Sequence, residues 1–225
     1  MAPNVGGKVY IVEHLDPELG PWSELEYISI AEESQESGSS FTLSSLPDGF
    51  KVPEALKAIP TFTATQDSVE DIYAGNKNKV CLLDPAAEKD LSPEDVQEFD
   101  AFLFGGILDR TSELRKKGFT GRRLGPVQMT TDTAVRVTRM VIQQQRGCSN
   151  LQKVAEIFWD VADKHQTVAL KDVPYTDHPE LKINEHESTQ MPFRYVKTED
   201  GEPIMPKGMR DLIGKDADKA IDDLF

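Results

Sequence analysis

Three segments of the 225-residue chain carry glycine, proline or polar side chains in places that suit ligand-binding loops. They are the Asp-Pro at 84–85, the Gly-Gly at 105–106 and the Gly-Pro at 125–126. Paired glycines allow a ligand to approach the backbone closely, and each segment alone equally fits an ordinary turn. Because ligands of parallel sheets bind beyond the carboxyl ends of the strands, we expect these segments to form a binding site. The sequence lacks the glycine-rich fingerprints of dinucleotide-binding and P-loop proteins.

The elements that must position these segments alternate between strands and helices. Continuous apolar runs at 80–83 and 101–104 predict buried strands, and runs that mix apolar with polar residues predict strands at 8–12, 41–46 and 167–170. Apolar residues at helical spacing predict helices at 22–33, 130–145 and 151–162, and Ser92 before Pro93 predicts a further helix start. This alternation indicates an α/β fold with a mostly parallel sheet and helices on both faces.

The composition changes after residue 170. Five prolines punctuate a polar stretch with few apolar runs, so residues 171–225 are predicted to form an extended tail that wraps the domain formed by residues 1–170. A short helix is expected at 209–213.

The chain carries 25 Lys+Arg against 39 Asp+Glu, which gives a formal net charge of −14. Such a charge argues against broad electrostatic capture of nucleic acid or of an anionic membrane, and it favours a basic partner. We expect the excess acid to cluster near the loops that end the strands.

The two cysteines and four histidines do not form a recognisable ligand motif. Cys81 and Cys148 are predicted to be reduced structural thiols, and the scattered histidines argue against a metal site. The first 25 residues lack a long apolar stretch, so we expect no secretory signal, no membrane span and a cytoplasmic protein.

The order of the loops resembles the cofactor half of the SPOUT methyltransferases. In that superfamily a Leu-Gly turn, an apolar residue, a threonine and an acid-Thr-Ala run start the last knot helix, and the matching residues here are Leu124, Gly125, Met129, Thr130, Asp132, Thr133 and Ala134. Further segments resemble the fungal SPOUT-type protein arginine methyltransferases, namely 81–85, 102–108, 109–111, 122–125, 128–134 and 191–195.

This resemblance implies a trefoil-knotted SPOUT domain that binds S-adenosylmethionine. It also implies that nine residues line the cofactor pocket: Leu83, Gly105, Ile107, Leu108, Leu124, Gly125, Met129, Thr130 and Thr133. The apolar members of this set would suit an adenine ring. One departure is that Leu108 joins Asp109 directly, whereas the family has a longer loop at this point that covers part of the cofactor.

Methyl transfer to arginine requires carboxylates that orient the guanidinium and accept a proton. The candidates are Glu13, at the end of the first predicted strand, and Asp109, beside the Gly-Gly segment. Alternatively, Glu13 is an exposed acid, Asp109 pairs with Arg110 or caps a helix, and Asp132 is a first-turn acid that favours the helix dipole.

The resemblance implies monomethylation of arginine in a basic protein, the third of the small ribosomal subunit. The alternatives are a SPOUT RNA methyltransferase, which the net charge disfavours, and an inactive adapter that binds a ribosomal protein. The long tail and the predicted helix at 151–162 favour a monomer, whereas a dimer formed through the knot helices is the alternative.

Overall fold

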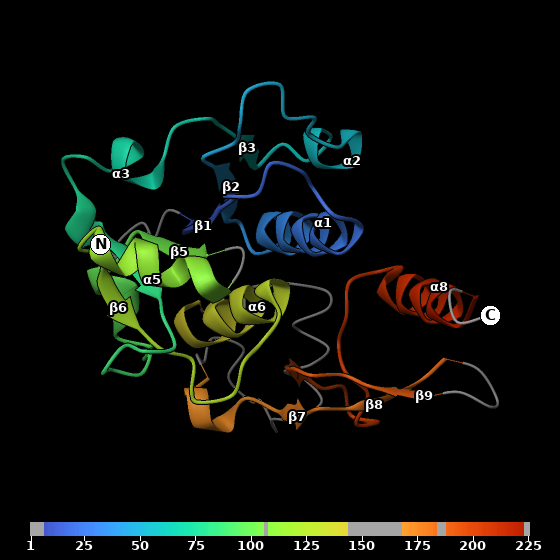
Figure 1. Ribbon diagram of the computed structural model, residues 1–225. Coiled ribbons are helices and arrows are strands. Elements are labelled where there is room, and N and C mark those ends of the chain that lie inside the picture. Colours follow the sequence, from blue (N-terminus) through green and yellow to red (C-terminus); the bar gives the residue numbers. More distant parts are fainter. Residues whose placement is uncertain (1–6, 106–107, 144–167, 184–187, 223–225) are drawn as a thin grey trace.

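The core of the protein is a parallel sheet of six strands in the order β3-β2-β1-β5-β4-β6 (Figure 1). The computed structural model describes residues 7–105, 108–143, 168–183 and 188–222. The strands are β1 (Val9–Glu13), β2 (Ser40–Ser44), β3 (Phe62–Ala64), β4 (Val80–Leu83), β5 (Ala101–Gly105) and β6 (Thr120–Arg122). All five neighbouring pairs run parallel, which confirms the predicted mostly parallel sheet.

The register aligns the carboxyl ends of the central strands. Glu13 at the end of β1 lies opposite Gly105 at the end of β5, and Leu82 of β4 lies opposite Leu103 of β5. Leu83 pairs with Arg122 at the end of β6. The segments that follow β4, β5 and β6 therefore leave the same edge of the sheet.

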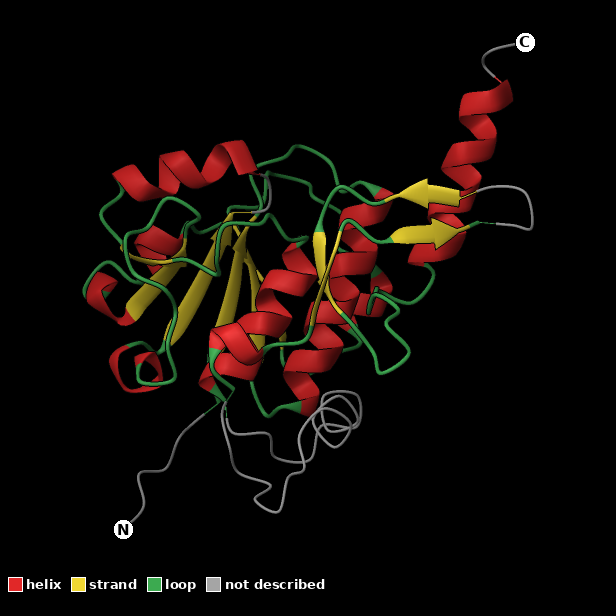
Figure 2. Cartoon of the chain, turned by 90° about the horizontal axis from the view of Figure 1, so that it is seen from below, coloured by secondary structure: helices red, strands yellow, loops and turns green. Residues whose placement is uncertain are grey.

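Helices cover both faces of the sheet, as predicted (Figure 2). The helices are α1 (Pro21–Glu36), α2 (Glu54–Lys57), α3 (Val69–Ile72), α4 (Asp95–Glu98), α5 (Leu108–Lys116), α6 (Thr131–Ile142) and α8 (Met209–Asp222), with 3-10 turns at Lys77–Lys79 and Leu170–Asp172. Side chains alternate along a strand, so Tyr10 packs in one apolar cluster with α1 and α6. Ile11 packs in the other, with Val69 of α3 and Leu114 of α5. Each fully buried side chain of this kind contributes about 1.5–3 kcal/mol.

The helix predicted at 130–145 is shorter than expected. It begins at Thr131 and ends at Ile142, because Gln143 has extended backbone angles. The Gln143 side chain accepts a hydrogen bond from the Tyr10 hydroxyl at 2.8 Å and donates one to Ser39 Oγ at 2.6 Å. These two bonds hold Gln143 away from the helical path.

Three other local predictions need correction. The strand predicted at 167–170 is absent over residues 168–170, where Leu170 instead starts a 3-10 turn. Glu94, not Ser92, precedes the first residue of α4, while the Ser92 backbone N–H donates to the Asp95 carboxylate at 2.8 Å. Strand β2 ends at Ser44 because the next residue, Ser45, has a φ of 58°. The helix predicted at 151–162 and Cys148 lie outside the described residues.

The C-terminal segment is more regular than the predicted extended tail. It contains two short antiparallel pairs, formed by β7 (Tyr175–Asp177) with β10 (Arg194–Val196) and by β8 (Glu180–Lys182) with β9 (Ser188–Gln190). The predicted short helix begins at Met209 as expected but continues to Asp222 as α8. A third apolar cluster joins this segment to α1, and its members include Leu181, Met191, Tyr195, Met209, Ile213, Trp22 and Leu25. The tail thus packs beside the first helix of the chain (Figure 1).

Candidate active site

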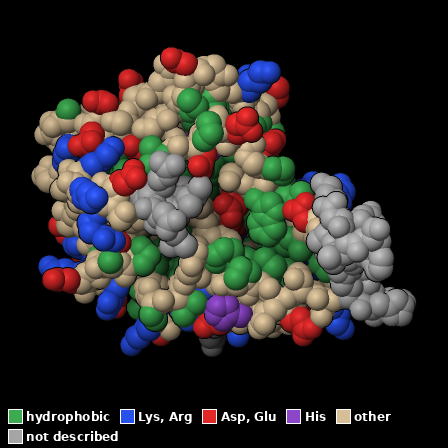
Figure 3. Space-filling view, viewed as in Figure 1, with side chains coloured by type: hydrophobic (Ala, Val, Ile, Leu, Met, Phe, Trp, Pro, Cys, Tyr) green, Lys and Arg blue, Asp and Glu red, His purple; other side chains and the backbone are tan. Residues whose placement is uncertain are grey.

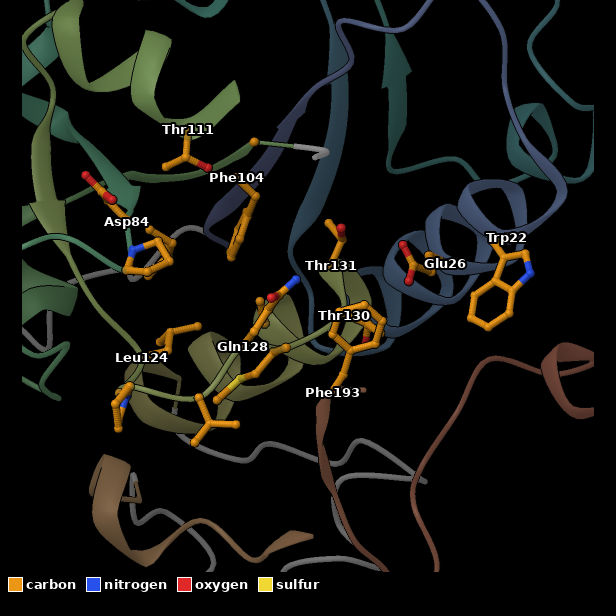
Figure 4. Close-up of a pocket in the computed structure, with 18 residues that line it drawn as sticks. Trp22, Glu26, Asp84, Phe104, Thr111, Leu124, Gln128, Thr130, Thr131 and Phe193 are labelled. Atoms are coloured by element: carbon orange, nitrogen blue, oxygen red, sulfur yellow. The ribbon is translucent and has the colours of Figure 1, made fainter. Parts of the chain in front are cut away.

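A cavity of about 670 Å³ opens where β4, β5 and β6 end, and α1 and the C-terminal segment complete its wall (Figure 4). Its volume lies in the range of sites that take small organic ligands. The residues that line it are Trp22, Glu26, Leu83, Asp84, Pro85, Phe104, Gly105, Thr111, Leu124, Gly125, Pro126, Val127, Gln128, Met129, Thr130, Thr131, Ala134 and Phe193. The three segments expected to form a site therefore meet at one cavity.

Six of the nine residues implied to bind the cofactor line this cavity: Leu83, Gly105, Leu124, Gly125, Met129 and Thr130. Thr133 does not line it; it lies fully buried below, where the Thr130 hydroxyl donates a hydrogen bond to its Oγ1 at 2.8 Å. Ile107 lies outside the described residues, and Leu108 begins α5 with a side chain that is not described.

The segment between β6 and α6 is shaped by its own backbone and by the tail. Gly125 has a φ of 99°, a conformation that side-chain-bearing residues rarely adopt, so glycine is required at this turn. The Arg194 backbone N–H donates to the Gln128 carbonyl at 2.8 Å and ties the segment to β10. The Arg194 guanidinium pairs with Asp177 at 2.6 Å and lies 4.4 Å from the centre of the Tyr175 ring. This wall of the cavity is therefore fixed by contacts from both sides.

Glu13 is not among the residues that line the cavity, although its strand ends beside Gly105. It is also not the exposed acid of the alternative interpretation, because it is 1% exposed. Its carboxylate accepts hydrogen bonds from the Ser44 and Ser45 hydroxyls, from the Val69 backbone N–H at 3.0 Å and from the Lys117 ammonium at 3.3 Å. Four donors saturate this carboxylate and connect β1 to β2, α3 and the end of α5.

The second candidate carboxylate, Asp109, belongs to the first turn of α5. Helix α5 starts at Leu108, and β5 ends at Gly105. The side chain of Asp109 is outside the described part of the structure.

Glu26 is the carboxylate that the sequence analysis missed. It projects from α1 into the cavity beside Thr131, and it lies one helical turn after Trp22 (Figure 4). Burial and the nearby carboxylate of Asp132 raise the pKa of Glu26 to about 8, against a smaller lowering by a hydrogen bond from Thr131. Trp22 and Glu26 share the spacing of one helix face, which is the signal that could have identified the pair.

Asp84 is the other acid at the cavity, and its negative charge is balanced by an ion pair with Arg115. Its carboxylate accepts two hydrogen bonds from the Arg115 guanidinium, at 2.5 and 2.7 Å. Burial alone would raise the pKa of Asp84, but the hydrogen bonds from Arg115 and from the Ala86 backbone N–H lower it. Asp84 is therefore held ionised and fixed beside the end of β4.

A buried ionic network lies behind Glu26 and joins α1 to α6. Glu33 of α1 pairs with both Arg136 and Arg139 of α6, and Arg136 also pairs with Asp132 at 3.3 Å. Among the described residues, Asp132 Oδ1 and the Tyr195 hydroxyl are buried polar atoms without a hydrogen-bond partner. Burial raises the pKa of Asp132, with Arg136 acting in the opposite direction. The buried polar groups between α1 and α6 are thus incompletely satisfied.

The described residues contain neither a candidate metal site nor a membrane-spanning helix. No group of three or more His, Cys, Asp or Glu side chains is placed to hold a metal ion there. Within the same residues, no helix is both long and apolar enough to cross a membrane.

Comparisons with known proteins agree with the resemblance drawn from the sequence. A profile of the family described as protein arginine N-methyltransferase SFM1-like matches residues 9–220. The protein arginine N-methyltransferase SFM1 of Saccharomyces cerevisiae is 37% identical over 234 aligned positions, which cover 96% of this chain and 99% of the yeast protein.

Solved structures of the yeast protein have the same fold. The crystal structure of yeast SFM1 complexed with SAM has a TM-score of 0.74 at 37% identity, over 93% of this chain and 91% of the yeast chain. The complex with SAH has a TM-score of 0.73 and covers 93% of this chain and 95% of the yeast chain. The chain described here therefore belongs to the family of SFM1-like protein arginine N-methyltransferases.

Proposed function

We propose that this protein transfers a methyl group from S-adenosylmethionine to an arginine side chain of a basic protein of the small ribosomal subunit. The observation that carries the proposal is Glu26, a carboxylate inside the cavity that has no ion-pair partner among the described residues. The substrate arginine is a cation, and a carboxylate is the side chain that recognises it in a planar, directional way.

The lining of the cavity suits the cofactor. Leu83, Leu124 and Met129 provide apolar contact surface, while the backbone at Gly105 and Gly125 is open to close approach. Neither glycine carries a side chain that would fill this space, and a Cβ at Gly125 would have only Arg194 within 4 Å. When bound, S-adenosylmethionine supplies an electrophilic methyl group on a positively charged sulfur.

The two ends of the cavity then have separate tasks. The loops after β4, β5 and β6 would hold the cofactor, and Glu26 on α1 would hold the arginine. Glu26 accepts hydrogen bonds from the guanidinium and takes up the proton that the attacking nitrogen loses. Placing the nitrogen next to the methyl group provides most of the acceleration, since positioning alone converts a bimolecular reaction into an effectively unimolecular one.

A raised pKa at Glu26 is compatible with this role. In the empty cavity, burial and Asp132 favour the protonated form of the side chain. An arriving guanidinium favours the carboxylate instead, because an opposite charge stabilises the ionised form of an acid. Binding of arginine therefore displaces a proton from Glu26 and leaves a base next to the reacting nitrogen.

We also propose that the protein acts as a monomer. Ten of the twelve residues of α6 are buried within the chain, and the helix contacts α1 and β10, so little of this helix is left for a second subunit. A cytoplasmic location fits a ribosomal-protein substrate and remains part of the proposal.

Transfer of tritiated methyl groups to ribosomal extract tests this function. We expect label that survives nuclease treatment and is lost on protease treatment. Label that is lost to nuclease instead would favour an RNA methyltransferase. A companion titration with S-adenosylmethionine by calorimetry separates an enzyme from an inactive adapter, since an adapter without a cofactor site would give no heat of binding.

A further inference from the structure

Two aromatic rings lie at the end of the cavity that contains Glu26. Trp22 belongs to the same face of α1 as Glu26, and Phe193 belongs to the segment between β9 and β10. In the view of Figure 4 the Glu26 carboxylate lies between the two rings. Both rings are partly buried and pack on the third apolar cluster, so the C-terminal segment supports each of them.

An aromatic pair around a carboxylate suits a guanidinium better than an ammonium ion. The guanidinium group is planar and weakly hydrated, so its faces stack on aromatic rings while its edge donates hydrogen bonds to a carboxylate. An ammonium ion is compact and strongly hydrated, and it lacks faces that could stack. At this end of the cavity, the two rings suit the faces of a guanidinium and the Glu26 carboxylate suits its edge.

We infer that Trp22 and Phe193 clamp the two faces of the substrate guanidinium while Glu26 binds its edge, and that Asp216 of α8 positions Trp22 for this task. The inference rests on the proposed function and assigns the arginine end of the same cavity. Trp22 and Phe193 act as specificity-determining residues, because they select the flat cation.

The position of Trp22 is set by α8. The indole N–H of Trp22 donates a hydrogen bond to Asp216 Oδ2 at 3.2 Å. Helix α8 also places Met209 and Ile213 in the cluster on which Trp22 and Leu25 pack. A ring held in this way loses little conformational entropy when substrate binds, which strengthens binding. Asp216 is thus a positioning residue that acts through the indole nitrogen.

The test measures kcat and KM with the purified ribosomal protein as substrate. The Trp22→Ala variant should lower kcat/KM about tenfold or more, since it removes a stacking partner, and Phe193→Ala should act in the same direction. Trp22→Phe keeps a ring but loses the N–H, so we expect a loss of about threefold. Asp216→Ala removes the acceptor of the indole N–H and should raise KM by a similar factor with kcat unchanged. The matched control is Asp211→Ala, which changes an exposed acid on the same helix and should leave both constants unchanged.

A double-mutant cycle separates positioning from general stabilisation. If Asp216 acts through the indole N–H, Asp216→Ala should have no further effect on KM in the Trp22→Phe background. An equal effect of Asp216→Ala in both backgrounds would overturn the positioning role. Affinity for S-adenosylmethionine, measured by calorimetry, should stay at the wild-type value in every variant, because the cofactor end of the cavity is untouched.

The outcomes also distinguish this inference from the proposed function. If the wild-type protein methylates the ribosomal protein and Trp22→Ala does so with the same kcat/KM, the aromatic clamp is wrong and the function stands. If the wild-type protein binds the cofactor but transfers no methyl group to arginine, the proposed function itself fails.

Discussion

Glu26 and Asp84 are two carboxylates of one cavity with opposite surroundings. Asp84 forms an ion pair with Arg115, which keeps the carboxylate ionised and balances its negative charge. Glu26 faces Asp132 instead and has no cationic partner among the described residues. Two acids whose environments push their pKa values apart have separate tasks. We therefore assign a structural or cofactor-side task to Asp84 and contact with arginine to Glu26.

Replacement of Glu26 by glutamine tests this assignment. Glutamine keeps the shape of the side chain but cannot pair with a guanidinium or take up a proton, so we expect kcat/KM to fall about 100-fold or more. Affinity for S-adenosylmethionine should be unchanged in calorimetry. The control is Glu32→Gln, an exposed acid on the same helix. Wild-type turnover in Glu26→Gln would remove Glu26 from the site.

The pH dependence of kcat/KM should report the ionisation of Glu26 in the free enzyme. Since the pKa of Glu26 is about 8 and the carboxylate is the active form, kcat/KM should rise with pH and level off above that value. Asp132→Asn removes the neighbouring negative charge, which lowers the pKa of Glu26 and moves the rise to lower pH. A rise at the same pH in both proteins would show that another group controls it.

Among the elements, the central strands and α1 are predicted well, because the pattern of apolar residues within each segment indicates which side chains are buried. Continuous apolar runs mark β4 and β5, since both faces of these strands are covered. The edge strand β3 is short and two of its three residues are exposed, so it has no apolar pattern to detect. The strands of the tail are equally hard to detect in the sequence, because each has three residues.

The sequence predicted the loops of the candidate site but not the side formed by α1. The segments after β4 and β5 follow apolar runs, and those at 105–106 and 125–126 carry glycine, so their convergence could be expected. Glu26 was missed because it is one of several acids on an amphipathic helix, and only tertiary packing places it opposite Thr131. Glu13 was selected because it ends a strand, yet it is buried among neighbours on β2, on α3 and directly after α5. Local sequence does not encode which acids of a helix or strand end face the cavity.

The turn at Gly125 offers a test of the cofactor loop. A side chain at a φ of 99° is strained although the space is open, so Gly125→Ala should lower the free energy of unfolding by about 1–2 kcal/mol. It should also weaken binding of S-adenosylmethionine, because the loop shifts to relieve the strain. Gly75→Ala is the matched control, since a Cβ there meets nothing within 4 Å and the backbone is unstrained. Equal cofactor affinity in Gly125→Ala and the wild type would contradict a role for this loop.

For the whole molecule, the net charge of −14 was expected to gather near the loops that end the strands. On the face shown in Figure 3 the acidic side chains are spread widely, whereas Lys and Arg side chains concentrate at the left, near α5 and β6. The preference for a protein substrate over RNA therefore rests on Glu26 and on the family, and less on the overall charge. The trefoil knot implied by the resemblance stays a prediction.

The burial of α6 predicts the oligomeric state. Because the chain covers this helix with its own α1 and β10, we expect light scattering after size-exclusion chromatography to give the mass of one chain, 25.1 kDa. The result should hold at low and at physiological salt, since charge repulsion is not what excludes the second subunit. A mass of two chains at micromolar concentration would favour the dimer through the knot helices.

The cavity is proposed to methylate arginine in a basic ribosomal protein. The most direct test is mass spectrometry of the purified ribosomal protein after incubation with S-adenosylmethionine and either the wild-type chain or Glu26→Gln. We predict that the wild type adds the mass of one methyl group, that fragmentation places this group on an arginine, and that Glu26→Gln adds almost none. An unmodified protein after incubation with a wild type that binds the cofactor, or a methyl group on a residue other than arginine, would contradict the account.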